Sequence, residues 1–230
     1  MRAGPLTTFS LWHFPTLEAR VWAFVQMGLA RAALGRQAGL VFWKLVGAGS
    51  GGGFSLEPDW SRYGLFAVWQ SAAHAERFFA EPAPVVARYR EHSDEEWTIR
   101  LEATQSKGKW SGENPFLTVA DARHAALANA ARLLAAVPAT SAALARAPGL
   151  LISVGVGEIP YLRQATFSLW RDEAALRDFA YRDPVHREVI ARTRDERWYS
   201  EELFARFRPV AASGAWAGRE PLREAAHDAR

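Results

Sequence analysis

The sequence predicts an α+β protein in which two ferredoxin-like halves, each with the order β-α-β-β-α-β, form a dimeric α/β-barrel-like pseudo-dimer within one chain. Two observations predict this fold. The chain matches itself over two stretches that align without a gap, 65–97 and 166–198. In addition, the spacing of apolar residues in each half switches between the period of a strand and the period of a helix.

Aromatic and acidic residues carry the self-match. The matched pairs are Phe66–Phe167, Trp69–Trp170, Phe78–Phe179, Asp94–Asp195, Glu95–Glu196 and Trp97–Trp198. Upstream, GLVFWKLVGAG (39–49) corresponds to GLLISVGVG (149–157) once a short length difference is allowed. Downstream, KGKWSGENPF (107–116) corresponds to SGAWAGREPL (213–222). The pattern is typical of an internal duplication.

The duplication predicts the limits of the repeats. We expect a first repeat over 1–112, a second over 113–222 and a polar tail over 223–230. Two small sheets of this kind can pack face to face, so both repeats are expected to form one structural unit.

In the first half, the periodicity predicts each element in turn. The expected elements are a strand at 6–14, a helix at 17–36 with apolar residues at helical spacing, strands at 40–49 and 62–69, a broken helical stretch at 71–95 and a strand at 96–104.

The second half predicts the same order. The expected elements are an opening strand at 125–133, a helix at 134–147, strands at 150–157 and 164–171, helices over 173–196 and a strand at 197–208. Alanine is a poor strand former, so the alanine-rich opening strand is the weakest assignment.

Composition excludes several kinds of site. The 230 residues contain no cysteine, which rules out disulfides, thiolate zinc sites, cysteine-ligated iron–sulfur clusters and thiolate-ligated haem. The net charge of +3 comes from scattered arginines rather than from a basic run, so we expect no nucleic-acid partner. The sequence shows neither a signal peptide nor an apolar span, so a cytoplasmic protein is expected.

A glycine-rich stretch, GAGSGGG at 47–53, matches a dinucleotide-binding pattern. No helix follows it, so no helix N-terminus is available for a pyrophosphate. The second half keeps only the first two glycines, which favours a turn at the strand end.

His186 stands out because its counterpart in the first half is Val85. Val189, Ile190 and Thr193 follow at helical spacing, so His186 is expected to face the interior. A buried imidazole needs a hydrogen-bond acceptor or a metal. A core histidine and a metal ligand are both consistent with the residues alone.

The chain is rich in aromatic residues, with 10 Trp and 13 Phe. Those on expected strands are Trp12, Phe42, Trp43, Phe66, Trp69, Phe167 and Trp170. Most are expected to be core, but a cavity lined by such residues would suit a flat macrocycle or a long polyene. His13 shares a strand face with Phe9 and Leu11, where a core or rim histidine is expected.

Several segments together resemble the spheroidene monooxygenase family, the carotenoid ketolases of purple bacteria. They are SLWHF, RVWAFVQM, FWKLVGAGSGGGF, PDW, FAVW, KGKWSGENPF, VGVGEIPYLRQATFSLW and HREVIARTRDERWYSEELFARF. The resemblance covers roughly 7–216 and is weakest in the first helix and in 121–148. The family is similar in architecture to dimeric α/β-barrel haem proteins such as chlorite dismutases.

The resemblance implies a haem iron, insertion of oxygen into an acyclic carotenoid, and a ferredoxin-type electron donor. It implies that His186 is the iron ligand, with Lys44 and Trp170 beside the cofactor. His13 and Arg182 are the candidates for catalytic polar contacts to oxygen.

Two other classes of function remain open. One is a cofactor-free or peroxidase-like barrel enzyme that acts on another apolar substrate. The other is a protein that binds haem or apolar ligands without turnover. Because carotenoids reside in membranes, the basic surface also predicts peripheral contact with the inner membrane, although no amphipathic anchor stands out.

Overall fold

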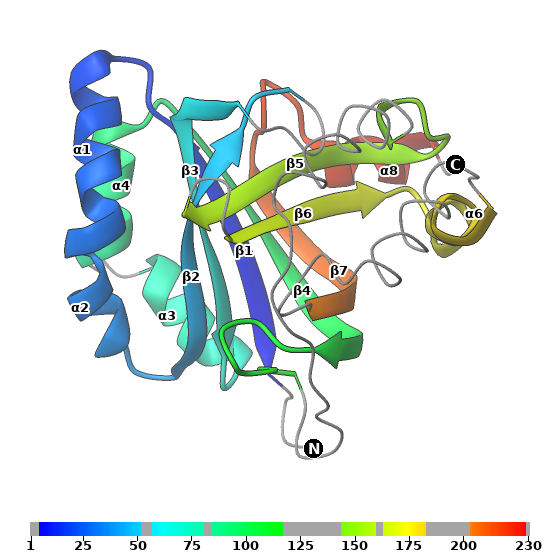
Figure 1. The fold of residues 1–230 in the computed structure, drawn as a ribbon, viewed down its shortest axis with the longest axis horizontal. Coiled ribbons are helices and arrows are strands. Elements are labelled where there is room, and N and C mark those ends of the chain that lie inside the picture. Colours follow the sequence, from blue (N-terminus) through cyan, green and yellow to red (C-terminus); the bar gives the residue numbers. More distant parts are fainter. Residues whose placement is uncertain are drawn as a thin grey trace.

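The structure is a computed structural model, which describes residues 5–51, 57–80, 84–116, 144–159, 163–182 and 203–228. These residues form one 7-stranded antiparallel sheet in the order β6-β5-β2-β3-β1-β4-β7 (Figure 1). The strands are β1 (Leu6–His13), β2 (Leu40–Gly49), β3 (Pro58–Trp69), β4 (Glu95–Gly108), β5 (Leu150–Ile159), β6 (Arg163–Trp170) and β7 (Leu203–Gly214).

Helices of the first half cover one side of the sheet, at the left of Figure 1, while α6 and α8 lie at the right. The helices are α1 (Leu17–Leu29), α2 (Arg31–Gly35), α3 (Ala72–Ala80), α4 (Pro84–His92), α6 (Glu173–Arg182) and α8 (Pro221–Asp228). Thr16 caps α1, because its side chain accepts a hydrogen bond from the backbone N–H of Ala19.

The elements expected in the first half are confirmed. Strand, helix, strand, strand, helix and strand follow one another, and the strands lie in the order β2-β3-β1-β4. The expected helix at 17–36 is divided into α1 and α2, and the stretch at 71–95 into α3 and α4. In the second half β5, β6 and α6 lie where strands and a helix were expected.

The sheet is strongly curled. In sheet order β1 and β6 are separated by β3, β2 and β5, so in a flat sheet they would lie roughly 19 Å apart. The rings of Phe9 on β1 and Phe167 on β6 are nevertheless only 4.8 Å apart between centroids. Trp97 on β4 also approaches Phe167, at 6.2 Å. The sheet therefore forms a half-barrel with a concave inner face.

Two hydrophobic cores lie on opposite faces of the sheet. The outer core packs the sheet against α1 to α4 and includes Trp12, Phe14, Leu45, Trp69, Phe78 and Tyr89. The inner core fills the concave face and includes Phe9, Leu11, Val46, Trp97, Ile99, Val154 and Leu169. The alternation of strand side chains explains the division, since successive residues point to opposite faces.

Segments paired by the sequence alignment adopt the same local geometry. Gly39 and Gly149 precede β2 and β5 with φ of 75° and 79°. Their carbonyl oxygens accept hydrogen bonds from the backbone N–H of Gln70 and Arg171, at 2.8 Å in each case. In both places the same turn therefore joins the start of one strand to the end of the next.

A second matching pair is the tight turn after β4 and after β7. Trp110 pairs with Glu113 in the first turn, and Trp216 pairs with Arg219 in the second. In both turns two successive residues have positive φ: 56° and 82° at Ser111 and Gly112, and 52° and 72° at Ala217 and Gly218. This geometry is that of a type I′ turn, in which both central residues have positive φ.

The last strand continues further along the chain than expected. β7 spans Leu203–Gly214 and so extends past residue 208, the end of the strand expected at 197–208; residues 197–202 lie outside the described residues. The strand continues past Pro209 because Val210 forms a bulge there: Leu101 pairs with Pro209 and Arg100 with Ala211. A bulge tolerates a proline, which cannot donate a ladder hydrogen bond.

Residues 223–228 of the expected polar tail at 223–230 lie on α8. Pro221 suits the first position of a helix, where its missing N–H is not needed. Glu224 accepts a hydrogen bond from the backbone N–H of Glu220, so the start of the helix is capped from within.

Other expectations fall wholly or mainly outside the described residues. They include the opening strand at 125–133 and most of the helix at 134–147. Gly47 and Gly49 of the glycine-rich stretch lie in extended backbone at the end of β2, where Gly47 pairs with Gly157 of β5. Gly47 and Gly49 thus lie both at the end of a strand and at the place where the two halves of the sheet join.

Candidate active site on the concave face

An aromatic surface lies on the concave face where β2, β3 and β7 meet the turn after β4. We call it the aromatic face; it consists of Phe42, Phe66, Trp110, Phe116 and Phe207. Ring centroids of neighbouring members are 5.3–6.4 Å apart. These are normal spacings for packed aromatic pairs.

Lys44 and Glu158 place a charged pair at the edge of the aromatic face. Lys44 lies on β2 between Phe42 and Val46 and points to the concave side, as alternation requires. Its Nζ atom is 3.3 Å from Oε1 of Glu158 on β5. The two side chains are only 11% and 8% exposed, so most of this ion pair is removed from water.

The turn after β4 completes the polar group. Lys44 Nζ donates a hydrogen bond of 2.6 Å to Oγ of Ser111. Trp110 Nε1 donates one of 2.8 Å to Oε1 of Glu158. The ammonium also lies 5.2 Å from the ring centroid of Phe42 and 5.7 Å from that of Trp110, within cation–π range. We call Lys44, Trp110, Ser111 and Glu158 the polar cluster.

Comparison of the two halves shows that the fold does not require the charges of the polar cluster. Lys44 pairs with Phe66 across β2 and β3, whereas Val154 pairs with Phe167 across β5 and β6. Since Phe66 and Phe167 are matched in the alignment, Val154 is the counterpart of Lys44. In the sequence alignment of 39–49 with 149–157, whose last residues are Gly49 and Gly157, Glu158 corresponds to the next residue, Ser50. In the alignment of 107–116 with 213–222, Ser111 corresponds to Ala217.

Burying two charges is unfavourable unless they are paired and hydrogen-bonded. Lys44 and Glu158 meet that condition, yet an aliphatic side chain occupies the matching position in the other half. Such a charged group in an apolar setting can hydrogen-bond an oxygen atom of a ligand or stabilise negative charge that develops on oxygen. The polar cluster is therefore the candidate chemical group of this site.

His13 does not lie with the polar cluster. It ends β1, and its Nδ1 atom is 2.7 Å from Oδ1 of Asp94, with a quarter of its side chain exposed. His13 shares the concave-facing side of β1 with Phe9, as expected, but is four residues further along. Phe9 is in register with Phe66, so His13 lies about 13 Å along the strands from the row that contains Lys44.

Trp170 lies on the opposite face of the sheet from Lys44. Its neighbours in sequence, Phe167 and Leu169, pack into the inner core, while its own ring stacks on Phe179 of α6 at 5.2 Å. Its Nε1 atom donates to Oγ of Ser168. The structure thus places Trp170 in helix–sheet packing, as it does the matched Trp69 with Phe78.

The structure describes one of the two other predicted site residues only in part, and the other not at all. His186 lies outside the described residues. The backbone of Arg182 ends α6, and its side chain is not described. Within the described ranges, no three His, Cys, Asp or Glu residues come together as a metal site.

Glu158, Trp110 and Ser111 were missed by the sequence reasoning, although Lys44 was identified. A usable indication existed, because each polar residue can be compared with its counterpart in the other half. Lys44 with Val154, and Glu158 with Ser50, show the same kind of asymmetry that drew attention to His186. What the sequence could not supply was the pairing of β2 with β5, which brings Lys44 and Glu158 together.

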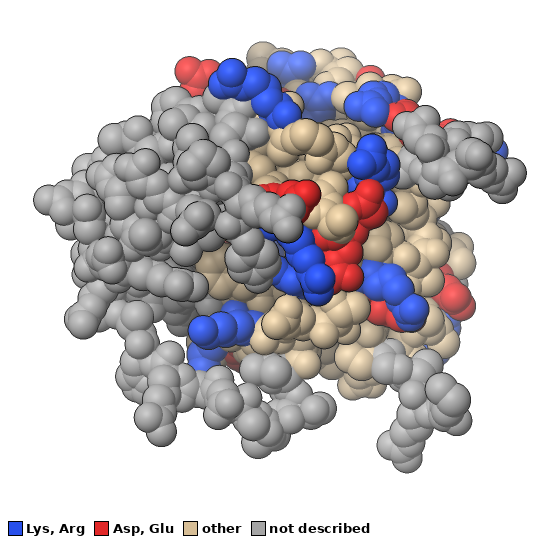
Figure 2. Space-filling view, turned by 90° about the vertical axis from the view of Figure 1, so that its right-hand side faces the viewer, with Lys and Arg blue, Asp and Glu red and all other residues tan. Residues whose placement is uncertain are grey.

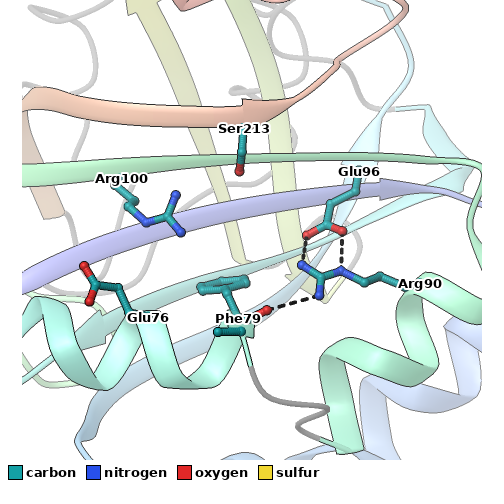
Figure 3. Close-up of a pocket in the computed structure, with 7 residues that line it drawn as sticks. Glu76, Phe79, Arg90, Glu96, Arg100 and Ser213 are labelled. Carbon is teal, nitrogen blue, oxygen red and sulfur yellow. Dashed lines mark hydrogen bonds and ion pairs between the residues drawn. The ribbon is translucent and has the colours of Figure 1, made fainter.

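A separate hollow of about 240 Å³ lies on the helix side, between α3, α4, β4 and β7 (Figure 3). Arg90 donates to both carboxylate oxygens of Glu96 and to the carbonyl of Phe79. The hydrogen bonds from Arg90 to Glu96 raise the pKa of the guanidinium above its usual range. The hollow is also lined by Arg100 and Glu76, so its two positive and two negative side chains balance. We therefore interpret the Arg90–Glu96 pair as a contact that joins α4 to β4, and not as a site for a charged ligand.

Comparison with known structures gives distant likenesses. SnoaB, a cofactor-independent oxygenase from Streptomyces nogalater, is 21% identical with a TM-score of 0.33, over 45% of this chain and 96% of that one. An anthrone oxidase-like protein is 17% identical with a TM-score of 0.33, over 94% of this chain and 95% of that one. Likenesses at this level carry no conclusion about activity. No protein-family model matches the chain.

The sequences of characterised proteins give a much closer match. The chain is 35% identical to a spheroidene monooxygenase of Cereibacter sphaeroides, over 95% of this chain and 71% of that protein. It is 34% identical to a spheroidene monooxygenase of Rhodobacter capsulatus, over 95% of both chains. A third, from Rubrivivax gelatinosus, is 32% identical over 87% of this chain and 81% of that protein. The chain therefore belongs to the spheroidene monooxygenase family.

Proposed function

We propose that this protein is a monooxygenase that inserts oxygen into an acyclic carotenoid, with the reacting carbon held against the aromatic face. The observation that carries the proposal is the polar cluster: a nearly buried Lys44–Glu158 pair at the edge of an aromatic surface, in a chain of this family. An aromatic wall suits the flat, apolar surface of a polyene.

The chemistry assigns a role to Lys44. In monooxygenation one atom of dioxygen enters a C–H bond to give an alcohol, and the other leaves as water after taking up two electrons and two protons. A second round at the same carbon gives a geminal diol, which loses water to form a ketone. The Lys44 ammonium, held by Ser111 and Glu158, stabilises negative charge on oxygen or donates a hydrogen bond to the new hydroxyl.

Turnover of spheroidene tests the proposal. Purified protein is incubated with spheroidene in detergent, dioxygen and a reductant, and the products are analysed by mass spectrometry. We expect a hydroxylated and then a keto product, formed only when dioxygen is present. Absence of oxygenated product under all these conditions would overturn the proposal.

Whether the reaction uses haem depends on which residues could bind the iron. The described residues of the aromatic face and polar cluster include no histidine, and His13 is engaged with Asp94 at the rim. These residues therefore offer no usual axial ligand for haem, and a haem site would depend on His186, outside the described residues. If haem binds, it supplies dioxygen activation; if not, the reaction is cofactor-independent oxygenation of an apolar substrate.

Absorption of the protein as isolated separates these two arms. A Soret band that His186→Val removes, with the thermal unfolding of the protein unchanged, would assign haem to His186. A colourless protein that still forms oxygenated product would overturn the haem proposal and support the cofactor-independent reaction. Val85, the counterpart of His186, makes valine the appropriate replacement because the matching position already accepts it.

Three further expectations stand as parts of this proposal. The electrons come from a ferredoxin-type donor. The halves 1–112 and 113–222 are duplicated ferredoxin-like repeats that form one pseudo-dimeric unit. The matched turns at Trp110 and Trp216 support the duplication, because they share the same pair of positive φ values.

A further inference from the structure

Helix α1 carries an apolar stripe that faces away from the protein. The stripe consists of Leu17, Val21, Phe24, Val25 and Leu29, whose exposed fractions are 76%, 56%, 55%, 45% and 68%. The spacing of four, three, one and four residues places all of them along one side of the helix. An apolar helix side would normally face the core.

The opposite side of α1 is built to pack closely against the sheet. Its buried residues are small or polar: Ala19, Ala23 and Gln26. Trp22 and Met27 flank them and are partly buried against the outer core. The helix therefore contributes small side chains to the interior and presents its large aliphatic and aromatic side chains to the outside.

A second element extends the exposed stripe. Trp60 on β3 is 53% exposed, and its ring lies 5.9 Å from that of Phe24 in an edge-to-face arrangement. The two rings form a continuous apolar surface with α1. Exposed apolar surface of this extent on one element is uncommon unless it meets a partner.

Arginines outnumber acidic residues in the segment that carries the stripe. Between residues 15 and 36 the chain carries three arginines, Arg20, Arg31 and Arg36, against a single acidic residue, Glu18. The guanidinium of Arg31 lies 5.2 Å from the ring of Trp43. Arg88 of α4 lies 5.7 Å from the ring of Trp22 on α1. Arginines next to tryptophans at the margin of an apolar stripe are the arrangement expected at a membrane–water boundary.

The face opposite α1 has a different distribution of charge. Figure 1 places α1 at the left edge of the view, and Figure 2 shows the molecule from the right. On the described part of that face, Lys and Arg alternate with Asp and Glu. The combination of an apolar stripe with predominantly basic neighbours is thus a feature of the α1 side.

We propose that α1 and Trp60 form a docking surface for a bilayer that contains anionic lipids. The apolar stripe enters the acyl–headgroup boundary, and the surrounding arginines contact the headgroup phosphates. Among the described residues no helix is long and apolar enough to cross a bilayer. This surface would bring the protein to the compartment where apolar polyenes dissolve, but the proposal does not depend on the reaction.

Vesicle co-sedimentation tests the proposal without substrate. We expect the full chain to bind vesicles of phosphatidylcholine with phosphatidylglycerol, and to bind less to phosphatidylcholine alone or in high salt. Leu17→Gln combined with Phe24→Gln should weaken binding by about tenfold or more, because two large apolar contacts are lost. The matched control is Phe204→Gln combined with Val210→Gln on β7, which are 62% and 52% exposed and should leave binding unchanged.

Three results would overturn the docking surface. Failure of the unaltered protein to bind anionic vesicles is the first, and equal binding by the α1 variant is the second. The third is a change from dimer to monomer in the α1 variant on sedimentation, with vesicle binding retained, which would assign the stripe to a second copy of the chain. Because the replaced side chains are exposed, the midpoint temperature of thermal unfolding should not change. A loss of vesicle binding then cannot be ascribed to unfolding of the variant.

Discussion

At the scale of single residues, Lys44 and Glu158 are held by mutual attraction and by two further hydrogen bonds, from Lys44 to Ser111 and from Trp110 to Glu158. Both charges lose most of their hydration, so each depends on the other. The half-barrel accommodates a valine at the position matching Lys44. The charges thus go beyond what the fold needs, which is the main reason for assigning them a chemical role.

Replacement of Lys44 by the residue of its counterpart separates stability from chemistry. Lys44→Val should lower the free energy of unfolding by about 3–5 kcal/mol, because Glu158 is left as a nearly buried carboxylate without its cationic partner. Adding Glu158→Ser should restore most of this loss. Urea unfolding of the wild type, the single variant and the double variant measures the effect; equal stability of all three would contradict an interdependent ion pair.

Asp59 gives a prediction for acid conditions. Burial acts to raise its pKa, but hydrogen bonds from Ser61 and Arg62 outweigh burial and hold the pKa below its usual value. A carboxylate whose pKa is lower in the folded state stabilises the fold above the unfolded-state pKa, and this contribution disappears as the pH falls through the folded-state pKa.

Asp59→Asn should therefore be less stable than the wild type near neutrality, and the difference should shrink on acidification to about pH 3. Urea unfolding of both proteins across this range measures the difference. A stability difference that stays constant with pH would show that Asp59 acts by packing rather than by charge.

At the residue level, the sequence named Lys44 through the family resemblance, as a residue beside the cofactor, and did not name its partners. In the structure Lys44 lies in the polar cluster with Ser111 and Glu158. The sequence predicts that His13 shares a strand face with Phe9 and Leu11, but its pairing with Asp94 depends on a contact between a strand end and a loop that no local pattern encodes. Trp170 was assigned to the cofactor, whereas strand alternation turns it toward α6.

At the scale of elements, two turns illustrate how glycine supports the half-barrel. Gly214 has a φ of 76°, and a Cβ there would lie far too close to the backbone oxygen of Glu96. Gly218 has a φ of 72° but open space around a Cβ. At both positions a residue with a side chain would be strained by the positive φ. Only at Gly214 would its Cβ also clash with the backbone.

Gly218→Ala should cost about 1–2 kcal/mol, the usual penalty for a left-handed residue with a side chain. Gly214→Ala should cost clearly more, because relief of the clash requires movement of the β4–β7 ladder, where Gly214 pairs with Trp97. Thermal unfolding of the two variants compares them directly. Similar melting temperatures would indicate that β7 moves without penalty.

Helix α1 shows the limit of pattern-based prediction. Its position was predicted from the spacing of apolar residues, and the structure confirms a helix there. An apolar helix side normally faces the core, but in α1 the large apolar residues face outward and small residues pack inward. Periodicity identifies a helix with two unlike sides, but only the neighbouring elements decide which side is buried.

At the scale of the whole molecule, the curl of the sheet creates the candidate site. Contact between Phe9 and Phe167 requires β1 and β6 to meet across the concave face, and the pairing of β2 with β5 joins the halves through glycine-containing strand ends. The self-match predicted two halves of the same plan, whose local geometries agree at Gly39 and Gly149. It did not predict which strands would join them, because strand pairing between repeats leaves no periodic pattern in sequence.

The most direct test of the central claim combines isotope labelling with the double replacement by counterpart residues. Wild-type protein supplied with spheroidene, a reductant and ¹⁸O₂ should give product in which the inserted oxygen carries the label. The Lys44→Val, Glu158→Ser variant should remain folded and lose roughly 100-fold or more in rate, as expected when charge stabilisation of oxygen is removed. Unlabelled product, or a folded double variant of undiminished rate, would contradict oxygen insertion at the polar cluster.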